Sequence, residues 1–581
     1  MLWRVTKPYL SAHRARVFAI IGLQLVATMS ALMLPDLNAA IIDKGVVVGD
    51  VGLVWRYGVI MLAISGLQAV ASGFAVYLAA SLAMGMGRYL RGEVFDKVQT
   101  FSSREVSEIV ASSLITRSTN DVQQIQMVTL MIFNMMIMAP IMGVGGVIMA
   151  LRMNVKLSGL LLIVIPIIAV TTFFAFRILS PLFKSQQTRL DNMNTVLREE
   201  LSGIRVIRAF VRQDDFNNRY TNANDALKAV ALKVGAVFAF IFPFLQLVFS
   251  AGSVAVVWFG GHLIESGEME IGALLAYISY LAMIFNATMT ASMMFFMLPR
   301  ASVTARRINE VLTTTPTITA PAHAKTLAEG QPITFKYEDV CVKYPGAEAP
   351  VLTHIDVTLD PGTVTALIGS TGSGKATMVA LLPRLIDPSA GRLTANGINL
   401  KELDPDALRD HIGYVPQTAY LFSGTVASTV SGVENPTEHD KERVWRALEA
   451  TQSVDFVSEL EHGLDTEVDP GGRNFSGGQR QRLAMARALY REANLYVFDD
   501  SFSALDYETD AAIRNNLRKY VGDAAVMIVA QRVATIRHAN QILVLDDEGE
   551  IVGRGTHKQL LKHCKTYQEI VASQVSEEEV R

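Results

Sequence analysis

The sequence contains little cysteine and carries almost no net charge. Its 581 residues include only two cysteines, Cys341 and Cys564, which lie far apart and have no partners at the spacing of metal ligands. We therefore expect two reduced cysteines in a cytosolic part of the chain. The formal net charge of −3 gives no indication of a nucleic-acid-binding protein.

Charged residues are also scarce, at 18% of the chain, while hydrophobic residues make up 50%. The apolar residues are unevenly distributed. Before about residue 300 they form long runs with almost no charge, and after about residue 330 strand-like, helix-like and charged segments alternate as in a soluble α/β domain. This pattern predicts a membrane-embedded half followed by a soluble half.

The apolar runs are long enough to cross a membrane as helices, because a helix needs roughly 20 apolar residues to span the hydrocarbon core. An even number of spans would place both ends of the chain on the same side. The six candidate spans are Val17–Leu34, Gly58–Leu82, Leu130–Leu151, Leu157–Phe176, Val237–Phe259 and Ile271–Met297.

Basic residues near the span ends indicate that both termini are cytoplasmic. The basic N-terminus superficially resembles a signal peptide, but no small-residue cleavage site follows it, so we expect a retained first span. Arg152 and Lys156, in the turn between spans three and four, are exceptions to the charge rule. The basic residues expected on the cytoplasmic side are Arg4, Lys7, Arg14, Arg16, Arg88, Arg91, Lys97, Arg177, Lys184 and Arg189.

The connections after spans two and four are long and helical in pattern, so we expect the helices to continue well into the cytoplasm. Breaks near residues 102–121 and 205–216 are candidate contact elements for the soluble half, with solvated loops as the alternative. A Thr-, Pro- and Ala-rich stretch separates the two halves. The predicted domains are a transmembrane domain at 1–311, a linker at 312–332 and a nucleotide-binding domain at 333–581.

The soluble half contains a glycine-rich phosphate-binding loop, VTALIGSTGSGKATMVALLPRL. A strand precedes the loop and a helix follows it. Glycines allow backbone N–H groups to close around phosphate oxygens, and the lysine reaches the outer phosphates. The predicted nucleotide-binding residues of this loop are Gly369, Ser370, Thr371, Gly372, Ser373, Gly374, Lys375, Ala376 and Thr377.

A second motif, LYVFDDSFSALD at residues 495–506, is a hydrophobic run that ends in two aspartates. Such a run suits a buried strand that delivers Asp499 and Asp500 to the edge of a nucleotide pocket. The motif NFSGGQRQRLAMARAL then places Ser476, Gly477, Gly478 and Gln479 at a helix start, too far from the first loop to belong to it.

NFSGGQ resembles the signature motif of ATP-binding cassette (ABC) proteins. Six spans ahead of one cassette resemble a half-transporter of the exporter fold, a resemblance that covers nearly the whole chain. The implied fold is an all-α membrane domain of six helices with long cytoplasmic extensions, followed by an α/β P-loop ATPase domain of the ABC type. It also implies two paired chains, each ATP being held between one P-loop and the other chain's signature.

The resemblance assigns roles to further residues, with ATP and Mg²⁺ as cofactors. Tyr344 would stack on adenine, and Gln417 would sense the nucleotide and contact the membrane arms. Asp499, through its water shell, and Gln417 would hold magnesium. Asp506 would lie at the dimer interface.

Three positions depart from the family pattern in the same pocket. Hydrolysing members carry Glu after the Walker B aspartate, where this chain has Asp500, whose carboxylate is shorter by one methylene. The switch histidine is Gln531, which cannot carry a proton or positive charge. Ala376 replaces the Ser or Thr that ligates magnesium. The catalytic positions Asp500 and Gln531 are thus both degenerate.

These departures predict a pocket that binds ATP and hydrolyses it poorly, while the signature can complete a partner's site. The favoured hypothesis is the degenerate half of a heterodimeric exporter of small hydrophobic or amphipathic molecules in a plasma membrane, as in a bacterial inner membrane. A slow homodimeric exporter, an exporter-fold importer and a nucleotide-gated regulatory subunit remain open. The substrate class is a family-level inference.

Overall fold

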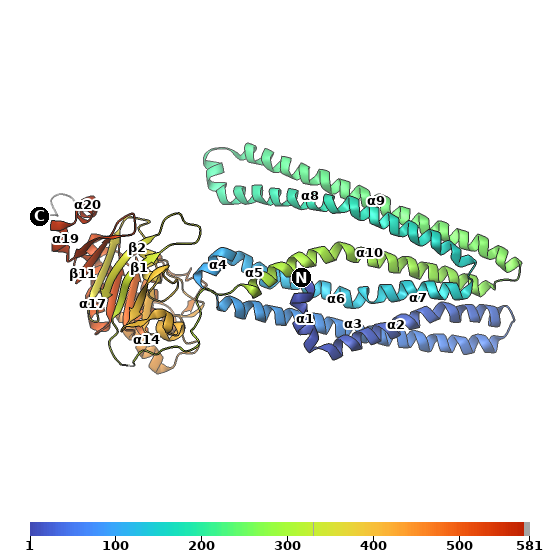
Figure 1. Cartoon of the computed structure of the whole chain (residues 1–581), viewed down its shortest axis with the longest axis horizontal. Coiled ribbons are helices and arrows are strands. Elements are labelled where there is room, and N and C mark those ends of the chain that lie inside the picture. The colour runs from blue at the N-terminus through green and yellow to red at the C-terminus, as the bar shows by residue number, and fades with distance from the viewer. Residues whose placement is uncertain (329, 575–581) are drawn as a thin grey trace. The chain divides into compact units, whose positions relative to one another are not determined.

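The computed structural model describes residues 1–328 and 330–574, apart from the side chains of residues 293, 295, 296 and 298–300. Glu329 of the predicted linker and residues 575–581 of the predicted nucleotide-binding domain therefore lie outside the described residues. The chain divides into two compact units, Met1–Gln99 with Val110–Thr314 and Thr100–Ile109 with Thr315–Arg581 (Figure 1). It passes from one unit to the other three times.

The first unit is helical, and the described residues contain six helices that are long and apolar enough to cross a membrane. This confirms the predicted number of spans. The unit consists of α1 (Leu2–Ala12), α2 (Arg14–Ala40), η1 (Ile41–Val46), α3 (Val51–Gln99), α5 (Ala111–Thr116), η2 (Arg117–Asp121), α6 (Val122–Met131), η3 (Ile132–Met136), α7 (Met138–Met153), η4 (Leu157–Leu160), α8 (Leu161–Ala209), α9 (Gln213–Glu265) and α10 (Ile271–Thr313).

Several of these helices are much longer than a membrane is thick, as the sequence predicts. Helices α3 and α8 have 49 residues each and α9 has 53. At about 1.5 Å per residue, each exceeds 70 Å, more than twice the roughly 30 Å hydrocarbon core. Helices α8 and α9 run side by side as an antiparallel pair joined by a short turn (Figure 1).

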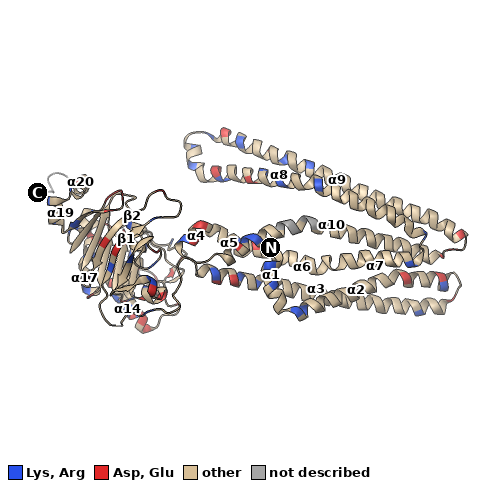
Figure 2. Cartoon of the chain, in the orientation of Figure 1, with Lys and Arg blue, Asp and Glu red and all other residues tan. Residues whose placement is uncertain are grey.

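Charged residues gather on the helix extensions and are sparse along the apolar stretches (Figure 2). The turn between α8 and α9 carries both signs, with an ion pair of 2.6 Å between Arg212 and Asp215. Another pair of 3.0 Å joins Arg219 to Glu199 across the two helices. These extensions are therefore suited to water, whereas the apolar stretches are suited to lipid.

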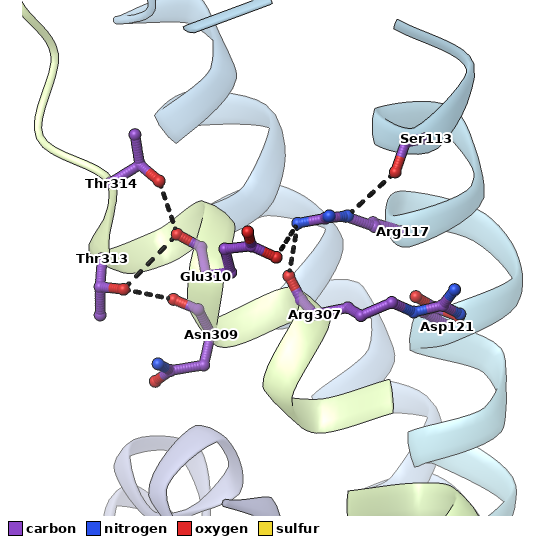
Figure 3. A network of polar contacts seen from close by, with 8 residues as sticks. All are labelled: Ser113, Arg117, Asp121, Arg307, Asn309, Glu310, Thr313 and Thr314. Atoms are coloured by element: carbon purple, nitrogen blue, oxygen red, sulfur yellow. Dashed lines mark hydrogen bonds and ion pairs between the residues drawn. The ribbon is translucent and has the colours of Figure 1, made fainter. Parts of the chain in front are cut away.

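A partly buried polar network holds the C-terminal end of α10 (Figure 3). The guanidinium of Arg117, in η2, donates to the Glu310 carboxylate and to the Arg307 carbonyl, each at 2.9 Å. Arg307 in turn pairs with Asp121, which is 2% exposed. The network joins the start of the third span to the helix that leads into the linker.

Replacing Arg117 is expected to destabilise the first unit. Arg117 is 9% exposed, and hydrogen bonds to charged groups contribute about 1.5–3 kcal/mol each. Arg117→Leu should lower the free energy of unfolding by about that amount in a denaturant titration of the purified protein. The control is Arg219→Leu, which breaks the exposed pair with Glu199 and should cost about 1 kcal/mol or less. Equal losses would contradict a special role for the buried network.

The second unit contains a four-stranded antiparallel sheet in the order β2-β1-β4-β5 and a six-stranded sheet in the order β12-β11-β3-β10-β9-β6. In the larger sheet only β12 is antiparallel. The strands are β1 (Phe335–Val342), β2 (Leu352–Leu359), β3 (Val364–Gly369), β4 (Ala390–Ala395), β5 (Ile398–Asn399), β6 (Ile412–Val415), β9 (Leu495–Asp499), β10 (Ala525–Val529), β11 (Gln541–Leu545) and β12 (Ile551–Gly555).

Strand β9 is buried at every residue and β10 likewise, as expected for near-continuous apolar runs in a parallel sheet. Helices cover this sheet, and their bounds near the site are α11 (Lys375–Ala380), α14 (Glu438–Ala450), α16 (Gly477–Tyr490), α17 (Tyr507–Tyr520) and α20 (Lys565–Gln574). Ligands in open α/β sheets bind at the carboxyl ends of the strands.

A segment from between the second and third spans belongs to this second unit. It comprises residues 100–109 and includes α4 (Ser103–Ile109). The hydroxyls of Ser102 and Thr317 lie 3.0 Å apart, and the Thr317 N–H donates to the Glu105 carboxylate at 3.2 Å. This segment is therefore tied to the chain that follows α10.

A candidate nucleotide-binding site

The loop between β3 and α11 has the backbone geometry of a phosphate cradle. Gly372 and Gly374 adopt φ angles of 95° and 89°, which favour glycine. A Cβ atom on Gly369 would lie 2.5 Å from the Leu545 carbonyl oxygen. Among the described residues, the N–H groups of Thr371, Gly372 and Gly374 donate to no protein acceptor. The loop thus presents free donors of the kind that phosphate oxygens require.

Lys375 lies folded over this loop. Its ammonium donates to the Gly369 carbonyl at 2.9 Å, to the Ser370 carbonyl at 2.5 Å and to the Ser373 hydroxyl at 3.3 Å. Burial lowers the pKa of Lys375, and the nearby charges of Asp500 and Asp499 oppose that shift. The cation is therefore available at the loop to pair with phosphate.

The two aspartates stand at the end of β9, and each is 7% exposed. Burial raises the pKa of both carboxyls. Asp499 accepts a hydrogen bond of 3.3 Å from the Tyr414 hydroxyl. Its other oxygen remains available for a cation, so the position can contribute to a magnesium site.

Asp500 is held by two amide groups. Its Oδ2 atom accepts hydrogen bonds from Gln417 Nε2 at 3.2 Å and from Gln531 Nε2 at 2.8 Å. The residue adopts φ 47°, a left-handed conformation that aspartate tolerates better than most side chains. These donors favour the charged carboxylate, but burial is the larger influence and the pKa of Asp500 is raised overall.

These contacts follow from strand order. Strands β3, β10, β9 and β6 are successive neighbours in the sheet, and they are followed by the P-loop, Gln531, Asp500 and Gln417 respectively. The carboxyl ends of parallel strands meet at one edge, so residues far apart in sequence become hydrogen-bonding neighbours.

Ala376 and Thr377 lie at the start of α11, and Tyr344, which follows β1, contacts Thr377. Ala376 is exposed and has no hydroxyl to offer a cation. The Thr377 hydroxyl lies 3.1 Å from the Tyr344 hydroxyl. The Tyr344 side chain is 43% exposed, which leaves a ring face that a nucleobase could stack upon.

The signature residues form a separate cluster. Ser476 caps α16, with its hydroxyl accepting from the Gln479 N–H at 3.3 Å, and Gln479 accepts in return from the Ser476 N–H at 2.9 Å. A Cβ atom on Gly478 would lie 3.4 Å from the Ala504 carbonyl oxygen, so the loop before α17 packs beside this helix start. In the described part of the chain, no hydrogen bond joins Ser476–Gln479 to the P-loop.

Asp506 belongs to this second cluster and caps α17. Its carboxylate accepts from the N–H and the hydroxyl of Thr509, each at 2.9 Å, and these hydrogen bonds lower the pKa of Asp506. The capping role alone accounts for an aspartate at this position.

Two residues near the site were not predicted from the sequence. Tyr414 lies on β6 and contacts Asp499, and the only available signal was its place three residues before Gln417. Gln574, on α20, accepts from the Val533 N–H at 2.8 Å and donates to the Gln531 carbonyl at 2.6 Å. No sequence pattern connects α20 to the segment after β10, so this contact could not be predicted.

We expect Gln574→Ala to loosen the segment that carries Gln531. Each hydrogen bond contributes about 1 kcal/mol, so amide hydrogen exchange at Val533 should quicken by up to about tenfold. The matched control is Gln568→Ala on the same helix, whose amide bonds only to the Leu561 carbonyl. Unchanged exchange at Val533 in the Gln574 variant would contradict the contact.

Comparisons with known proteins agree with this architecture. Residues 17–289 match the ABC transporter transmembrane region family, and residues 352–503 match the ABC transporter family. An uncharacterized ABC transporter ATP-binding protein of Mycobacterium tuberculosis is 44% identical over 99% of this chain and 98% of its own length. The chain belongs to the ABC transporter family.

Two further similarities concern this ABC transporter chain. An ATP-dependent lipid A-core flippase of Thiobacillus denitrificans is 26% identical over 98% of this chain and 97% of its own length. The structure of a bacterial Atm1-family ABC exporter with ATP bound superposes with a TM-score of 0.81, at 21% identity, and covers 97% of this chain and 99% of that chain. The superposition with the Atm1-family exporter shows that this chain has the exporter fold.

The family and the fold together give the chain's general role. It is a half-transporter of an ABC exporter, a multi-pass protein of the bacterial inner membrane whose cassette binds ATP and drives transport. A half-transporter of this fold works as a dimer.

Proposed function

We propose that this chain is the weakly hydrolysing half of a heterodimeric ABC exporter. Its own pocket binds ATP, and its signature motif completes the hydrolytic pocket of a different partner chain. The observation that carries the proposal is the pair of amide donors on one oxygen of Asp500, from Gln417 and Gln531.

ATP fits the pocket. The P-loop has free N–H groups, and the ammonium of Lys375 lies against the same loop. Tyr344 offers a half-exposed ring for the base. Bound ATP would supply the phosphate charge that bridges two cassettes. Among the described residues, no hydrogen bond joins the chain's own P-loop to the signature, which is therefore available to a partner. The signature residues are Ser476, Gly477, Gly478 and Gln479.

Magnesium fits less well. Asp499 and Gln417 remain as candidate oxygen donors, but Ala376 removes the hydroxyl that the family pattern places after the lysine. The Thr377 hydroxyl is engaged near Tyr344. We therefore propose a pocket with reduced magnesium affinity.

Hydrolysis requires a base that can take a proton from the attacking water. Asp500 is short, and its Oδ2 already accepts two hydrogen bonds. Gln531 has an uncharged amide, which cannot stabilise charge as a protonated histidine can. Together these features favour ATP retention over turnover, with hydrolysis carried by the partner's pocket.

The proposed cargo is small and hydrophobic or amphipathic. The support is the named activity of the lipid A-core flippase relative, an amphipathic cargo moved by a protein similar along nearly its whole length. This is a statement of substrate class only.

The test is the intact mass of the complex isolated from native membranes by a tag on this chain. We expect a second, different chain of similar size at one-to-one stoichiometry. Two identical tagged chains would overturn the heterodimer and leave a slow homodimeric exporter.

A further inference from the structure

A cavity of about 490 Å³ lies between α1 and the membrane helices, remote in sequence from the nucleotide site. Its walls come from α1, the start of α2, the end of α6 and the start of η3. The volume falls within the range of about 300–1,000 Å³ typical of small-molecule sites. The lining surface is almost wholly apolar, and the polar residues among its lining are Thr6, Lys7, Ser11, Arg14 and Thr129.

Two of the lining residues are cations. Lys7 and Arg14 both line the cavity, and among the described residues neither forms an ion pair with a carboxylate. The Arg14 Nε atom donates to the Ser11 carbonyl at 2.9 Å, which holds the guanidinium beside the cavity. An anionic group beside these two side chains would therefore meet positive charge that no carboxylate of the described residues pairs with.

The cavity becomes more apolar in the direction of the membrane interior. With cytoplasmic termini, both the first and the third span run outward from the cytoplasm. Along the first, Arg14 is followed one turn later by Phe18, and along the third, Thr129 is followed by Ile132 and Phe133. Both walls thus change from polar to apolar residues in the outward direction of their spans.

The outer surface of this region also suits lipid. Trp3 is 65% exposed and Phe18 is 70% exposed, although both are large apolar side chains. Aromatic residues of this kind are enriched at membrane interfaces, and an amphipathic helix with basic residues lies in the interface plane. Helix α1 lies outside the matched transmembrane family region, which begins at residue 17.

We propose that this cavity binds one anionic phospholipid of the cytoplasmic leaflet, with its phosphate at Lys7 and Arg14 and an acyl chain against Phe18, Ile132 and Phe133. The lipid would fasten α1 to the first and third spans. The proposal is independent of whether the nucleotide pocket is degenerate.

The test uses the purified, assembled transporter and native mass spectrometry, with phosphatidylglycerol or zwitterionic phosphatidylcholine added at equal concentration. We expect preferential retention of phosphatidylglycerol. Lys7→Gln with Arg14→Gln should weaken that retention about 30-fold, the factor expected when two basic groups near an anionic lipid surface are lost.

The chain offers a matched control in Arg4→Gln with Arg16→Gln. Both residues are exposed, Arg4 on α1 and Arg16 on α2, and they carry the same total charge, but they do not line the cavity. The control pair should retain the lipid. Equal losses in the two double variants would show diffuse charge attraction and overturn the site.

Two further variants test the cavity itself. Ile132→Trp fills the apolar end and keeps every charge, so it should also lose phosphatidylglycerol, and undiminished retention would overturn the proposal. A photoreactive residue in place of Leu10, which lines the cavity, should form an adduct with phospholipid. An adduct with the partner subunit instead would show that protein covers the cavity and would likewise overturn it. Each variant is first checked for ATP binding and an unchanged elution volume.

Discussion

The combined change Asp500→Glu, Gln531→His and Ala376→Ser is expected to raise ATP hydrolysis in this chain's pocket by about 10²-fold or more, because a well-placed general base contributes roughly 10²- to 10⁴-fold. Glutamate extends the carboxylate by one methylene. Histidine in place of Gln531 removes one of the two amide groups that now donate to the carboxylate at position 500. Serine restores a hydroxyl at the exposed start of α11.

The measurement is the phosphate release rate of the assembled transporter in which the partner subunit's own pocket has been disabled. Asp500→Gln with the same two companion changes is the control, because glutamine matches glutamate in size and cannot act as a base. Normal ATP binding with an unaltered rate, or an equal gain in the control, would contradict the degeneracy argument.

The single change Asp500→Glu should give a smaller gain than the triple. Asp500 adopts φ 47°, and a left-handed backbone costs most side chains about 1–2 kcal/mol. Gln531 would also remain as a donor on the new carboxylate.

Gly477→Asp is expected to reduce ATP hydrolysis by the whole transporter by about 10²- to 10³-fold. Removing one hydrogen-bond donor to the transition state lowers the rate of an enzyme by a similar factor. A Cβ atom at Gly477 would meet nothing within 4 Å, so the chain itself accommodates the substitution. The added carboxylate would instead face the phosphates bound in the partner's pocket and repel them.

Gly477→Asn, which has the same shape without the charge, is the matched control and should retain most of the activity. Lys375→Met in this chain should also spare most of the turnover, because the pocket it damages contributes little hydrolysis. If the lysine variant loses as much activity as Gly477→Asp, the two pockets contribute alike and the proposed division of labour is wrong.

The membrane fold could be predicted because its signal is local. Each apolar run of roughly 20 residues identifies a span without knowledge of its neighbours. The P-loop and the strand that ends in Asp499 were visible for the same reason, since glycine spacing and a buried apolar run are both short-range patterns.

Contacts between distant residues could not be predicted in this way. Arg117 and Glu310 are 193 residues apart, and Gln574 reaches a segment more than 40 residues before it. Neither pair has a motif, because each depends on which helices pack together. The cavity beside α1 could not be predicted from the sequence. Lys7 and Arg14 were identified there only as basic residues preceding the first span, because their shared cavity depends on how α1 packs against the membrane helices.

The nucleotide-binding site could be predicted in part, because it combines local motifs with contacts between distant residues. The sequence predicted a shared pocket for Asp500 and Gln531 through a family resemblance, and the geometry supplies a physical link, because β9 and β10 are adjacent parallel strands. The catalytic and metal-binding roles of these residues stay predictions until the variants are measured.

The chain passes between its compact units after Gln99, Ile109 and Thr314, so the second unit is assembled from two separate stretches of sequence. Cutting the chain between α10 and β1 would leave residues 100–109 covalently joined to the first unit, although they belong to the second. A fragment that begins at Thr315 would lack ten residues of its own compact unit, so the two halves are less separable than their sequence order suggests.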